Sequence, residues 1–502
     1  MKVLALPNSY AVHYQLKHNA NSSSSHSVIL AHGAVREVDN KELGADAQTQ
    51  EYGWSYFVLT TPEEKAAYAI QSAYNQHRYV NIPFLEERFG VKFNDDGYID
   101  HQSVHALIVP NVHEHESENQ RKVFDIWKRY VIDNPNLVIV GGNDNDDGSY
   151  HDYVQCSDVS ELNDEIAQAY DWYDIDILEE DNVTTIFSPS SGKRIIIDWN
   201  KHGFPKLKTP ALVDLKITDY CTFACKFCYQ GSTKKGKHVD IYQLGLIVDV
   251  LAESNIKELV VGGGEPTQHP DFEEFLRYAK TKGLSVSFTT KSEKWINSQH
   301  DFWLDDITGN VAFSVTSHEE VQRIHSKFVA CGRGNYMHRV QFQCIQGVTS
   351  GYDFRQILHY CFVNGLTLTM LGFKTTGRGV DYDKKEYGLF VENVAHFLAS
   401  LPFSDNTQDI LSHNDRRFTL LCDTKFAQDN RESMSRLLKD KWNFNVRKQY
   451  IFEEEGLVSC YIDPLNKVVM KSSYHQDCSF KYDTFTKQTF EEAWLKIRTK
   501  VD

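Results

Sequence analysis

Three closely spaced cysteines are the clearest sign of chemistry in this sequence. Residues 221–230 read CTFACKFCYQ, which puts Cys221, Cys225 and Cys228 in a C-x3-C-x2-C pattern. A structural zinc site and a [4Fe–4S] cluster both usually take four protein ligands, so three cysteines would leave one iron of a cluster open. The residues alone leave three interpretations: a cluster with one open iron, a zinc site with a distant fourth ligand, or ordinary buried thiols.

The elements that must position these cysteines follow from alternating apolar and amphipathic stretches. The predicted strands are Leu212–Ile217, Glu258–Val261, Ser285–Thr289, Val311–Val315, Val340–Ile345 and Thr367–Leu371. The predicted helices between them are Tyr242–Glu253, Asp271–Thr281, Glu319–Ala330 and Phe354–Val363. This alternation indicates right-handed crossovers and a parallel sheet. Six βα units are too few for a closed eight-stranded barrel, so we predict an open, partial barrel.

A glycine-rich segment lies where it could face the cysteines. Gly262-Gly263-Gly264-Glu265-Pro266 directly follows the second predicted strand, and the cysteines follow the first. In parallel α/β sheets, the loops at the carboxyl ends of the strands carry the chemistry. The two loops are therefore expected at the same edge of the sheet.

These features together resemble the radical S-adenosylmethionine (radical SAM) superfamily. The family's cysteine motif has an aromatic residue before the last cysteine, here Phe227, and its GGEP motif matches residues 263–266. The partial (βα)6 barrel agrees with that family's fold. The resemblance covers roughly residues 206–380.

The resemblance implies roles for individual residues. Cys221, Cys225 and Cys228 would bind three irons of a [4Fe–4S] cluster, and S-adenosylmethionine would chelate the fourth. Gly263, Gly264 and Glu265 would hold the methionine amine, Tyr229 would lie near the adenine, Ser314 and Thr290 would contact the ribose or carboxylate, and Gly372 would line the adenine site. For Ser314 and Thr290, an ordinary polar residue at a strand end is an equal alternative. The acid and base groups of the reaction are not assigned.

The resemblance also implies a mechanism. The reduced cluster would pass one electron to the sulfonium, and the carbon–sulfur bond would break homolytically. The resulting 5′-deoxyadenosyl radical would take a hydrogen atom from the substrate, while the protein positions the cofactor. The electron would come from a one-electron donor such as flavodoxin or ferredoxin.

The last hundred residues resemble the SPASM and twitch extensions of this superfamily. A hairpin is predicted over residues 459–469 and a helix over residues 489–497. The dense cysteine run of a full SPASM domain is absent, and Met470-Lys471-Ser472 stands where a cysteine is usual. We therefore favour an extension without a cluster. One auxiliary iron–sulfur cluster, using Cys422, Cys460, Cys478 and a fourth ligand, is the alternative.

We therefore predict an α/β protein with three parts. Residues 1–205 would form an N-terminal α+β domain of unknown role that could bind substrate or a leader peptide. Residues 206–400 would form the partial (βα)6 TIM-like barrel, and residues 401–502 a small SPASM/twitch-like α+β extension.

Composition narrows the function. The chain has 502 residues, of which 53 are basic and 69 acidic, and its net charge of −16 argues against electrostatic binding of nucleic acid. The N-terminus does not resemble a signal peptide, and no apolar run approaches the ~18 residues of a membrane span, so we predict a cytoplasmic protein with no membrane partner.

Our leading hypothesis is a radical SAM enzyme that modifies a peptide or protein. The first alternative is the same chemistry on a small molecule, nucleotide or sugar. The alternative from another class is a non-catalytic iron–sulfur redox or scaffold protein.

Overall fold

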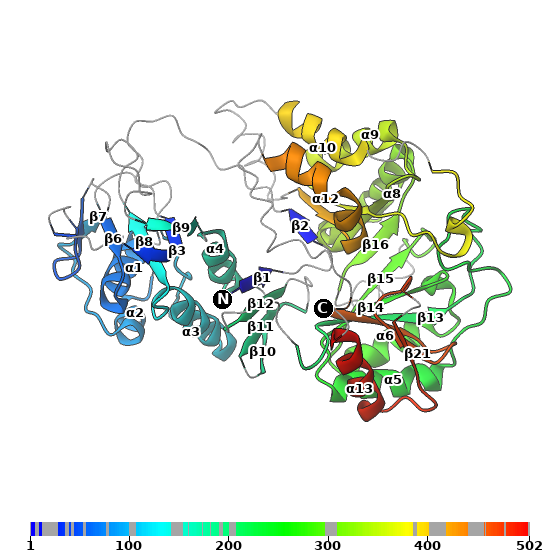
Figure 1. Ribbon diagram of the computed structural model, residues 1–502, viewed down its shortest axis with the longest axis horizontal. Helices are drawn as coiled ribbons and strands as arrows, with labels where there is room; N and C mark the ends of the chain where they lie inside the picture. The colour runs from blue at the N-terminus through cyan, green and yellow to red at the C-terminus, as the bar shows by residue number, and fades with distance from the viewer. Residues whose placement is uncertain are drawn as a thin grey trace. The chain divides into compact units, whose positions relative to one another are not determined.

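The structure of the chain is a computed structural model (Figure 1). It describes residues 2–5, 10–12, 29–35, 40–41, 45–53, 57–76, 80–99, 107–141, 154–158, 160–172, 174–180, 182–189, 194–199, 207–296, 309–384, 389–400, 418–439, 456, 458–475 and 478–499. The chain divides into two compact units. One holds residues 1–15, 179–184 and 188–502, and the other holds residues 16–178 and 185–187.

The unit formed by residues 16–178 and 185–187 contains a four-stranded sheet and a small three-stranded sheet. The larger sheet has the order β6-β8-β3-β9, and its strands are β3 (Ile29–Val35), β6 (Phe57–Leu59), β8 (Leu137–Gly141) and β9 (Val154–Asp158). The smaller sheet has the order β4-β5-β7, with β4 (Ala45–Asp46), β5 (Glu51–Tyr52) and β7 (Tyr98–Ile99). The helices are α1 (Pro62–Gln76), α2 (Ile82–Phe89), α3 (Glu118–Val131) and α4 (Ser160–Ala169).

The other unit is built on an eleven-stranded sheet in the order β2-β19-β18-β17-β16-β15-β14-β13-β20-β21-β22. Its strands are β2 (Tyr10–Val12), β13 (Leu212–Thr218), β14 (Glu258–Gly263), β15 (Ser285–Thr290), β16 (Val311–Ser314), β17 (Val340–Ile345), β18 (Thr367–Leu371), β19 (Thr419–Cys422), β20 (Ser459–Asp463), β21 (Val468–Met470) and β22 (Ser479–Lys481). The six predicted strands, β13 to β18, are confirmed. Two more parallel strands extend the set: β19 pairs with β18, and β20 pairs with β13.

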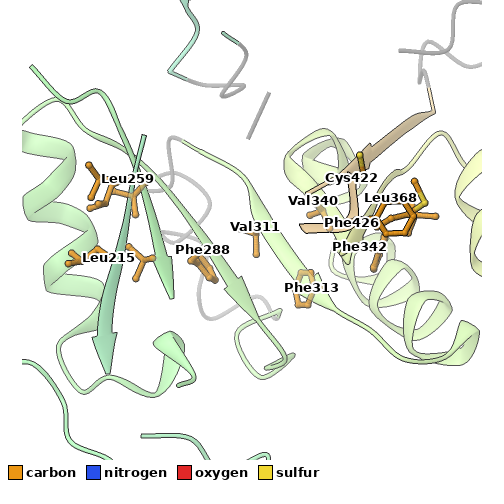
Figure 2. Close-up of a cluster of buried hydrophobic side chains, with 14 of the residues drawn as sticks. Leu215, Leu259, Phe288, Val311, Phe313, Val340, Phe342, Leu368, Cys422 and Phe426 are labelled. Atoms are coloured by element: carbon orange, nitrogen blue, oxygen red, sulfur yellow. The ribbon is translucent and has the colours of Figure 1, made fainter. Parts of the chain in front are cut away.

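Helices cover this sheet and bury its main hydrophobic core. They are α5 (Ile241–Glu253), α6 (Phe272–Thr281), α8 (His318–Ala330), α9 (Gly351–Val363), α10 (Leu389–Ser400), α12 (Thr424–Lys439) and α13 (Lys487–Thr499). Figure 2 shows the core side chains that successive strands contribute, among them Leu215, Phe288 and Phe313. Successive side chains of a strand point to opposite faces, so Lys216 and Ser314, the neighbours of Leu215 and Phe313, face away from this core.

A further four-stranded sheet has the order β1-β12-β11-β10, and a buried ion pair links its strand β12 to β14. Its strands are β1 (Lys2–Ala5), β10 (Asp176–Glu180), β11 (Val183–Phe187) and β12 (Arg194–Asp198). The Arg194 guanidinium lies 2.8 Å from the Glu258 carboxylate at the start of β14. Both side chains are almost completely buried, so each charge depends on the other for compensation.

Among the described residues, no helix has both the length and the apolar character needed to cross a membrane.

Candidate functional site

The three cysteines lie on one loop between β13 and α5. The loop is closed by backbone hydrogen bonds, from Cys221 N–H to the Thr233 carbonyl (3.0 Å) and from Asp219 N–H to the Lys237 carbonyl (2.8 Å). The three thiols are free and partly exposed. They are therefore accessible to a group bound at the mouth of the barrel.

The glycine segment packs directly against the base of the cysteine loop. Gly264 N–H donates to the Thr218 carbonyl (2.6 Å), and Glu265 N–H donates to the Tyr220 carbonyl (2.9 Å). Gly263 has a φ of +118°, which favours glycine. A Cβ on Gly264 would lie 2.1 Å from the Tyr220 carbonyl oxygen. The loops after β13 and β14 therefore meet, as predicted, and glycine allows the close contact.

We expect Gly264→Ala to force these loops apart. The new methyl group has no room beside the Tyr220 carbonyl, and overpacking of this kind costs about 1–3 kcal/mol. Urea unfolding should show this loss, and the cysteine loop should exchange its amide hydrogens faster. Gly245→Ala, on α5, is a matched control because its new Cβ would make only an ordinary contact at 3.7 Å. Equal exchange rates in the wild type and Gly264→Ala would contradict the prediction.

The Glu265 carboxylate is buried, with 3% of the residue exposed, and it is held by hydrogen bonds. Its Oε1 accepts from the Thr267 and Thr290 hydroxyls, each at 2.6 Å, and its Oε2 accepts from Lys291 N–H at 2.9 Å. Burial raises the pKa of Glu265, although these hydrogen bonds oppose the shift. Thr290 therefore orients Glu265, a contact that the sequence did not predict.

We expect Thr290→Val to destabilise the protein by about 1–3 kcal/mol, because it leaves a buried carboxylate short of one hydrogen bond. In the wild type, the hydrogen bond from Thr290 lowers the pKa of Glu265. The pKa of Glu265 should therefore rise further in the variant. Denaturant unfolding measures the first effect, and infrared titration of the carboxyl group measures the second. Thr290→Ser keeps the hydroxyl and serves as the control. A variant Thr290→Val as stable as Thr290→Ser would refute the assigned role.

The loop after β18 holds the cysteine loop from another side. Arg378 Nε donates to the Cys225 carbonyl and Arg378 Nη1 to the Ser232 carbonyl, both at 2.9 Å. Arg378 N–H donates to the Cys228 carbonyl, also at 2.9 Å. A Cβ on Gly377 would lie 2.5 Å from the Tyr229 carbonyl oxygen. Arg378 thus fixes the backbone at two of the three cysteines, a role that the sequence did not predict.

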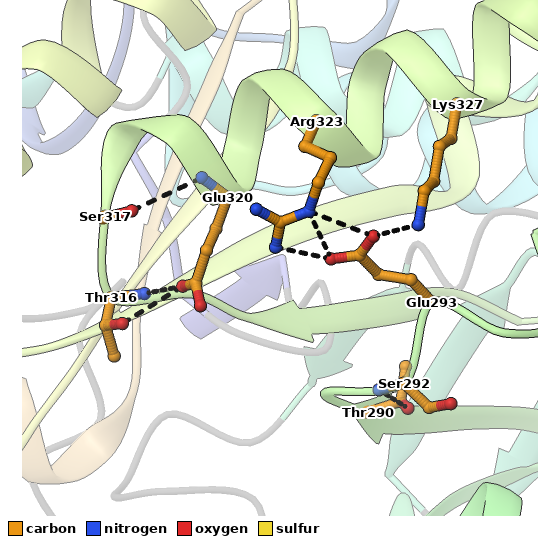
Figure 3. Close-up of polar contacts among 8 residues, drawn as sticks. All are labelled: Thr290, Ser292, Glu293, Thr316, Ser317, Glu320, Arg323 and Lys327. Carbon is orange, nitrogen blue, oxygen red and sulfur yellow. Dashed lines mark hydrogen bonds and ion pairs between the residues drawn. The ribbon is translucent and has the colours of Figure 1, made fainter.

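The loops after β15 and β16 are held by a separate set of polar contacts (Figure 3). Arg323 Nη2 on α8 lies 2.7 Å from Glu293 Oε1, and Lys327 also contacts Glu293. Thr316 N–H donates to the Glu320 carboxylate at 2.6 Å. Ser314, which ends β16, precedes this rigid turn at the carboxyl edge of the sheet.

Two predicted cofactor-binding residues also contact the rest of the chain. The Tyr229 hydroxyl accepts from the Ser473 hydroxyl at 3.3 Å, and the Lys374 ammonium lies 4.7 Å from the centre of the Tyr229 ring. Gly372 N–H donates to Asp423 Oδ1 at 2.8 Å. Tyr229 therefore joins the cysteine loop to the C-terminal segment, and Gly372 joins the end of β18 to the start of α12.

The cysteine loop has the chemistry that a [4Fe–4S] cluster needs. Burial raises the pKa of Cys221, and the neighbouring Cys225 and Cys228 raise it further. Burial also raises the pKa of Cys225, although the positive charges of Lys291 and Arg378 oppose this shift. Coordination by a metal deprotonates such thiols. In the described part of the chain, no three His, Cys, Asp or Glu side chains converge closely enough to hold a single metal ion. A four-iron cluster is larger than one ion, so its thiolates need not converge on one point.

The remaining cysteines named for an auxiliary cluster do not come together. Cys422 is on β19 and Cys460 on β20, with six strands between them in the sheet order. Cys422, Cys460 and Cys478 are all buried within the hydrophobic core. Their thiols are packed as small apolar groups, so the structure gives no support to a cluster that draws on these three.

With this geometry established, comparison with known proteins identifies the domain. Residues 215–296, which run from β13 through the cysteine loop and past β15, match the family model of the Radical SAM superfamily. The chain therefore contains a radical SAM domain, which confirms the family predicted from the cysteine and GGEP motifs.

Individual relatives resemble only parts of the chain. A mycofactocin maturase MftC of Mycobacterium ulcerans is 32% identical over 96 residues, which cover 19% of this chain and 25% of that protein. A probable GTP 3′,8-cyclase of Metallosphaera sedula is 34% identical over 84 residues, or 16% of this chain and 26% of that protein. This chain thus spans about a quarter of these curated relatives. The crystal structure of SuiB from Streptococcus suis superimposes with a TM-score of 0.47 and 11% identity, over 65% of this chain and 90% of that one.

Proposed function

We propose that the protein is a radical SAM enzyme that abstracts a hydrogen atom from a peptide or protein substrate and so modifies it. One observation carries the proposal: the radical SAM match spans the loop with three free thiols and the GGEP segment that packs against it. When bound, a [4Fe–4S] cluster with S-adenosylmethionine supplies a 5′-deoxyadenosyl radical. Everything else required of the protein is binding, orientation and exclusion of water.

The described residues are suited to those tasks. Cys221, Cys225 and Cys228 would hold three irons, on a loop whose carbonyls accept hydrogen bonds from Arg378. Glu265 and the backbone of the glycine segment present acceptors to the methionine amine, which as an ammonium is a strong donor. Thr290 keeps the Glu265 carboxylate in its orientation.

The proposal of a peptide substrate is supported by the C-terminal extension and by the partial likeness to a maturase. The second candidate function, the same chemistry on a nucleotide or another small molecule, is favoured by the partial likeness to a GTP 3′,8-cyclase. A precursor-peptide gene beside the gene for this protein would favour the first.

The experiment is an anaerobic incubation of reconstituted protein with S-adenosylmethionine and dithionite, in which 5′-deoxyadenosine and methionine are measured by chromatography. The proposal expects both products in equal amounts, even without substrate, and neither from the variant with Cys221, Cys225 and Cys228 all replaced by alanine. A reconstituted protein that holds iron but yields no 5′-deoxyadenosine would instead be a redox or scaffold protein.

A further inference from the structure

A cavity of about 690 Å³ lies between the cysteine loop and the C-terminal hairpin β20–β21. One wall is the chain that follows the third cysteine, from Tyr229 to Thr233, and another is formed by β20 and β21 with Tyr461 and Asp463. None of the residues that we assign to the cluster or to the methionine amine lines it. The cavity therefore begins one residue beyond Cys228, at Tyr229, which the sequence resemblance places near the adenine.

Charged groups of opposite sign meet in one wall. The Lys216 ammonium lies 2.6 Å from Asp219 Oδ1 and 3.0 Å from Asp463 Oδ2. Lys216 and Asp463 are buried, whereas the Asp219 side chain is 32% exposed. This cluster holds two carboxylates and one ammonium, so it carries one net negative charge. Lys235 also lines the cavity, but it is exposed and its charge is screened by solvent.

Asp463 has little capacity left for a ligand, and Asp219 has more. The Asp463 carboxylate accepts from Lys216 and also from the backbone and side-chain amides of Asn466, at 3.1 and 2.8 Å. Asp219 accepts from Lys216 through one oxygen and is the more exposed of the two carboxylates. Asp219 is therefore the acceptor that an incoming cation can reach.

A second observation points to a missing ligand. Ser232 lines the cavity and is 3% exposed, and its hydroxyl has no hydrogen-bond partner among the described residues. A buried polar group without a partner costs stability, so such groups are usually satisfied by water or a ligand. Thr233, the next residue, donates its N–H to the Asp219 carbonyl at 3.3 Å. The chain at Ser232 and Thr233 therefore lies against the backbone of Asp219, and both Ser232 and Asp219 line the cavity.

We propose that this cavity binds a positively charged group of the substrate, a lysine or arginine side chain or an amino terminus, with Asp219 and Ser232 as its acceptors. This inference rests on the proposed function and adds the chemistry of the residue that the enzyme recognises. An ammonium group has three donors and no acceptor, so a carboxylate beside an unpartnered hydroxyl complements it. Bound there, the substrate lies next to the cysteine loop.

The test measures the binding of three dansylated tripeptide amides, Gly-Lys-Gly, Gly-Leu-Gly and Gly-Glu-Gly, to the anaerobically reconstituted full chain saturated with S-adenosylmethionine. Fluorescence anisotropy should show the lysine peptide bound about tenfold more tightly than the leucine peptide, as for a hydrogen bond to a charged group. The glutamate peptide should bind most weakly. Asp219→Asn and Ser232→Ala should each reduce the preference for lysine.

The control is Asp249→Asn, because Asp249 pairs with Lys282 at 2.6 Å on the helical surface, away from the cavity. This variant should keep the preference for lysine. Equal binding of the three peptides, or a preference that survives Asp219→Asn, would overturn the inference. So would displacement of the lysine peptide when S-adenosylmethionine is added to protein prepared without it, since the cavity would then belong to the cofactor. The 5′-deoxyadenosine assay tests the proposed function independently of peptide binding. Failure of the proposed function can therefore be distinguished from failure of this inference.

Discussion

Iron and sulfide should fall from about four of each per chain to none when Cys221, Cys225 and Cys228 are together replaced by alanine. The three thiols lie on one loop and supply every protein ligand of the proposed cluster. Elsewhere in the described part of the chain, no three His, Cys, Asp or Glu side chains converge to hold a metal ion in their place. The measurement is iron and sulfide analysis after anaerobic reconstitution, and 5′-deoxyadenosine formation should be lost in parallel.

The matched control is Cys344→Ala, which removes a buried thiol from β17 and should keep all of the iron. About eight irons in the wild type, falling to four in the triple variant, would show that an auxiliary cluster exists elsewhere. Zinc without iron in the wild type would refute the radical mechanism.

The second large effect should come from Arg194→Met, which we expect to lower the free energy of unfolding by about 3–5 kcal/mol at about pH 8, where Glu258 is mostly ionised in the wild type. Arg194 is the ion-pair partner of Glu258, and both side chains are almost completely buried. Methionine fills much of the same space but leaves the carboxylate without a compensating charge. Urea unfolding of the two proteins gives the difference.

This effect should depend on pH. Burial raises the pKa of Glu258 to about 7, against the opposing influence of Arg194. The carboxyl group of Glu258 therefore keeps its proton to higher pH in the folded protein than in the unfolded chain, where its pKa is 4.5. The stability that the protonated group contributes is lost as the pH rises from 4.5 toward 7. Without Arg194 the pKa of Glu258 rises further, so the variant should be closer to wild type at about pH 5 than at about pH 8.

Lys282→Met, which breaks the exposed pair with Asp249, should change stability little at either pH. If Arg194→Met is as stable as wild type at both pH values, the ion pair does not compensate a buried charge.

The sequence predicted well those features that depend on local patterns. Every strand from β13 to β18 lies where apolar runs indicated it, because a parallel strand buried on both faces is a continuous apolar stretch. The meeting of the cysteine loop and the glycine segment followed from strand direction alone. The positions of these motifs were therefore predictable, whereas the cofactor roles of their residues remain predictions.

What the sequence could not predict are contacts between residues far apart in the chain. The ion pair between Lys216 and Asp463 joins residues 247 positions apart, and no periodic pattern marks such a pair. For the same reason, β19 and β20 were assigned to the C-terminal extension, although each pairs in parallel with a strand of the barrel. Nor does a residue type reveal that Arg378 donates to main-chain carbonyls rather than to a ligand.

The pairing of β20 with β13 has a consequence for the order in which the chain can fold. β13 leaves the ribosome long before its neighbour, because Lys216 and Asp463 are separated by 247 residues. At typical rates of synthesis, this interval lasts roughly 10–50 s. During that time, one edge of β13 has no partner, and the ammonium of Lys216 lacks one of its two carboxylates. The oxygen-sensitive thiols of the adjacent loop emerge before the hairpin that completes their surroundings, so we expect the nascent chain to be most vulnerable to oxidation in that interval.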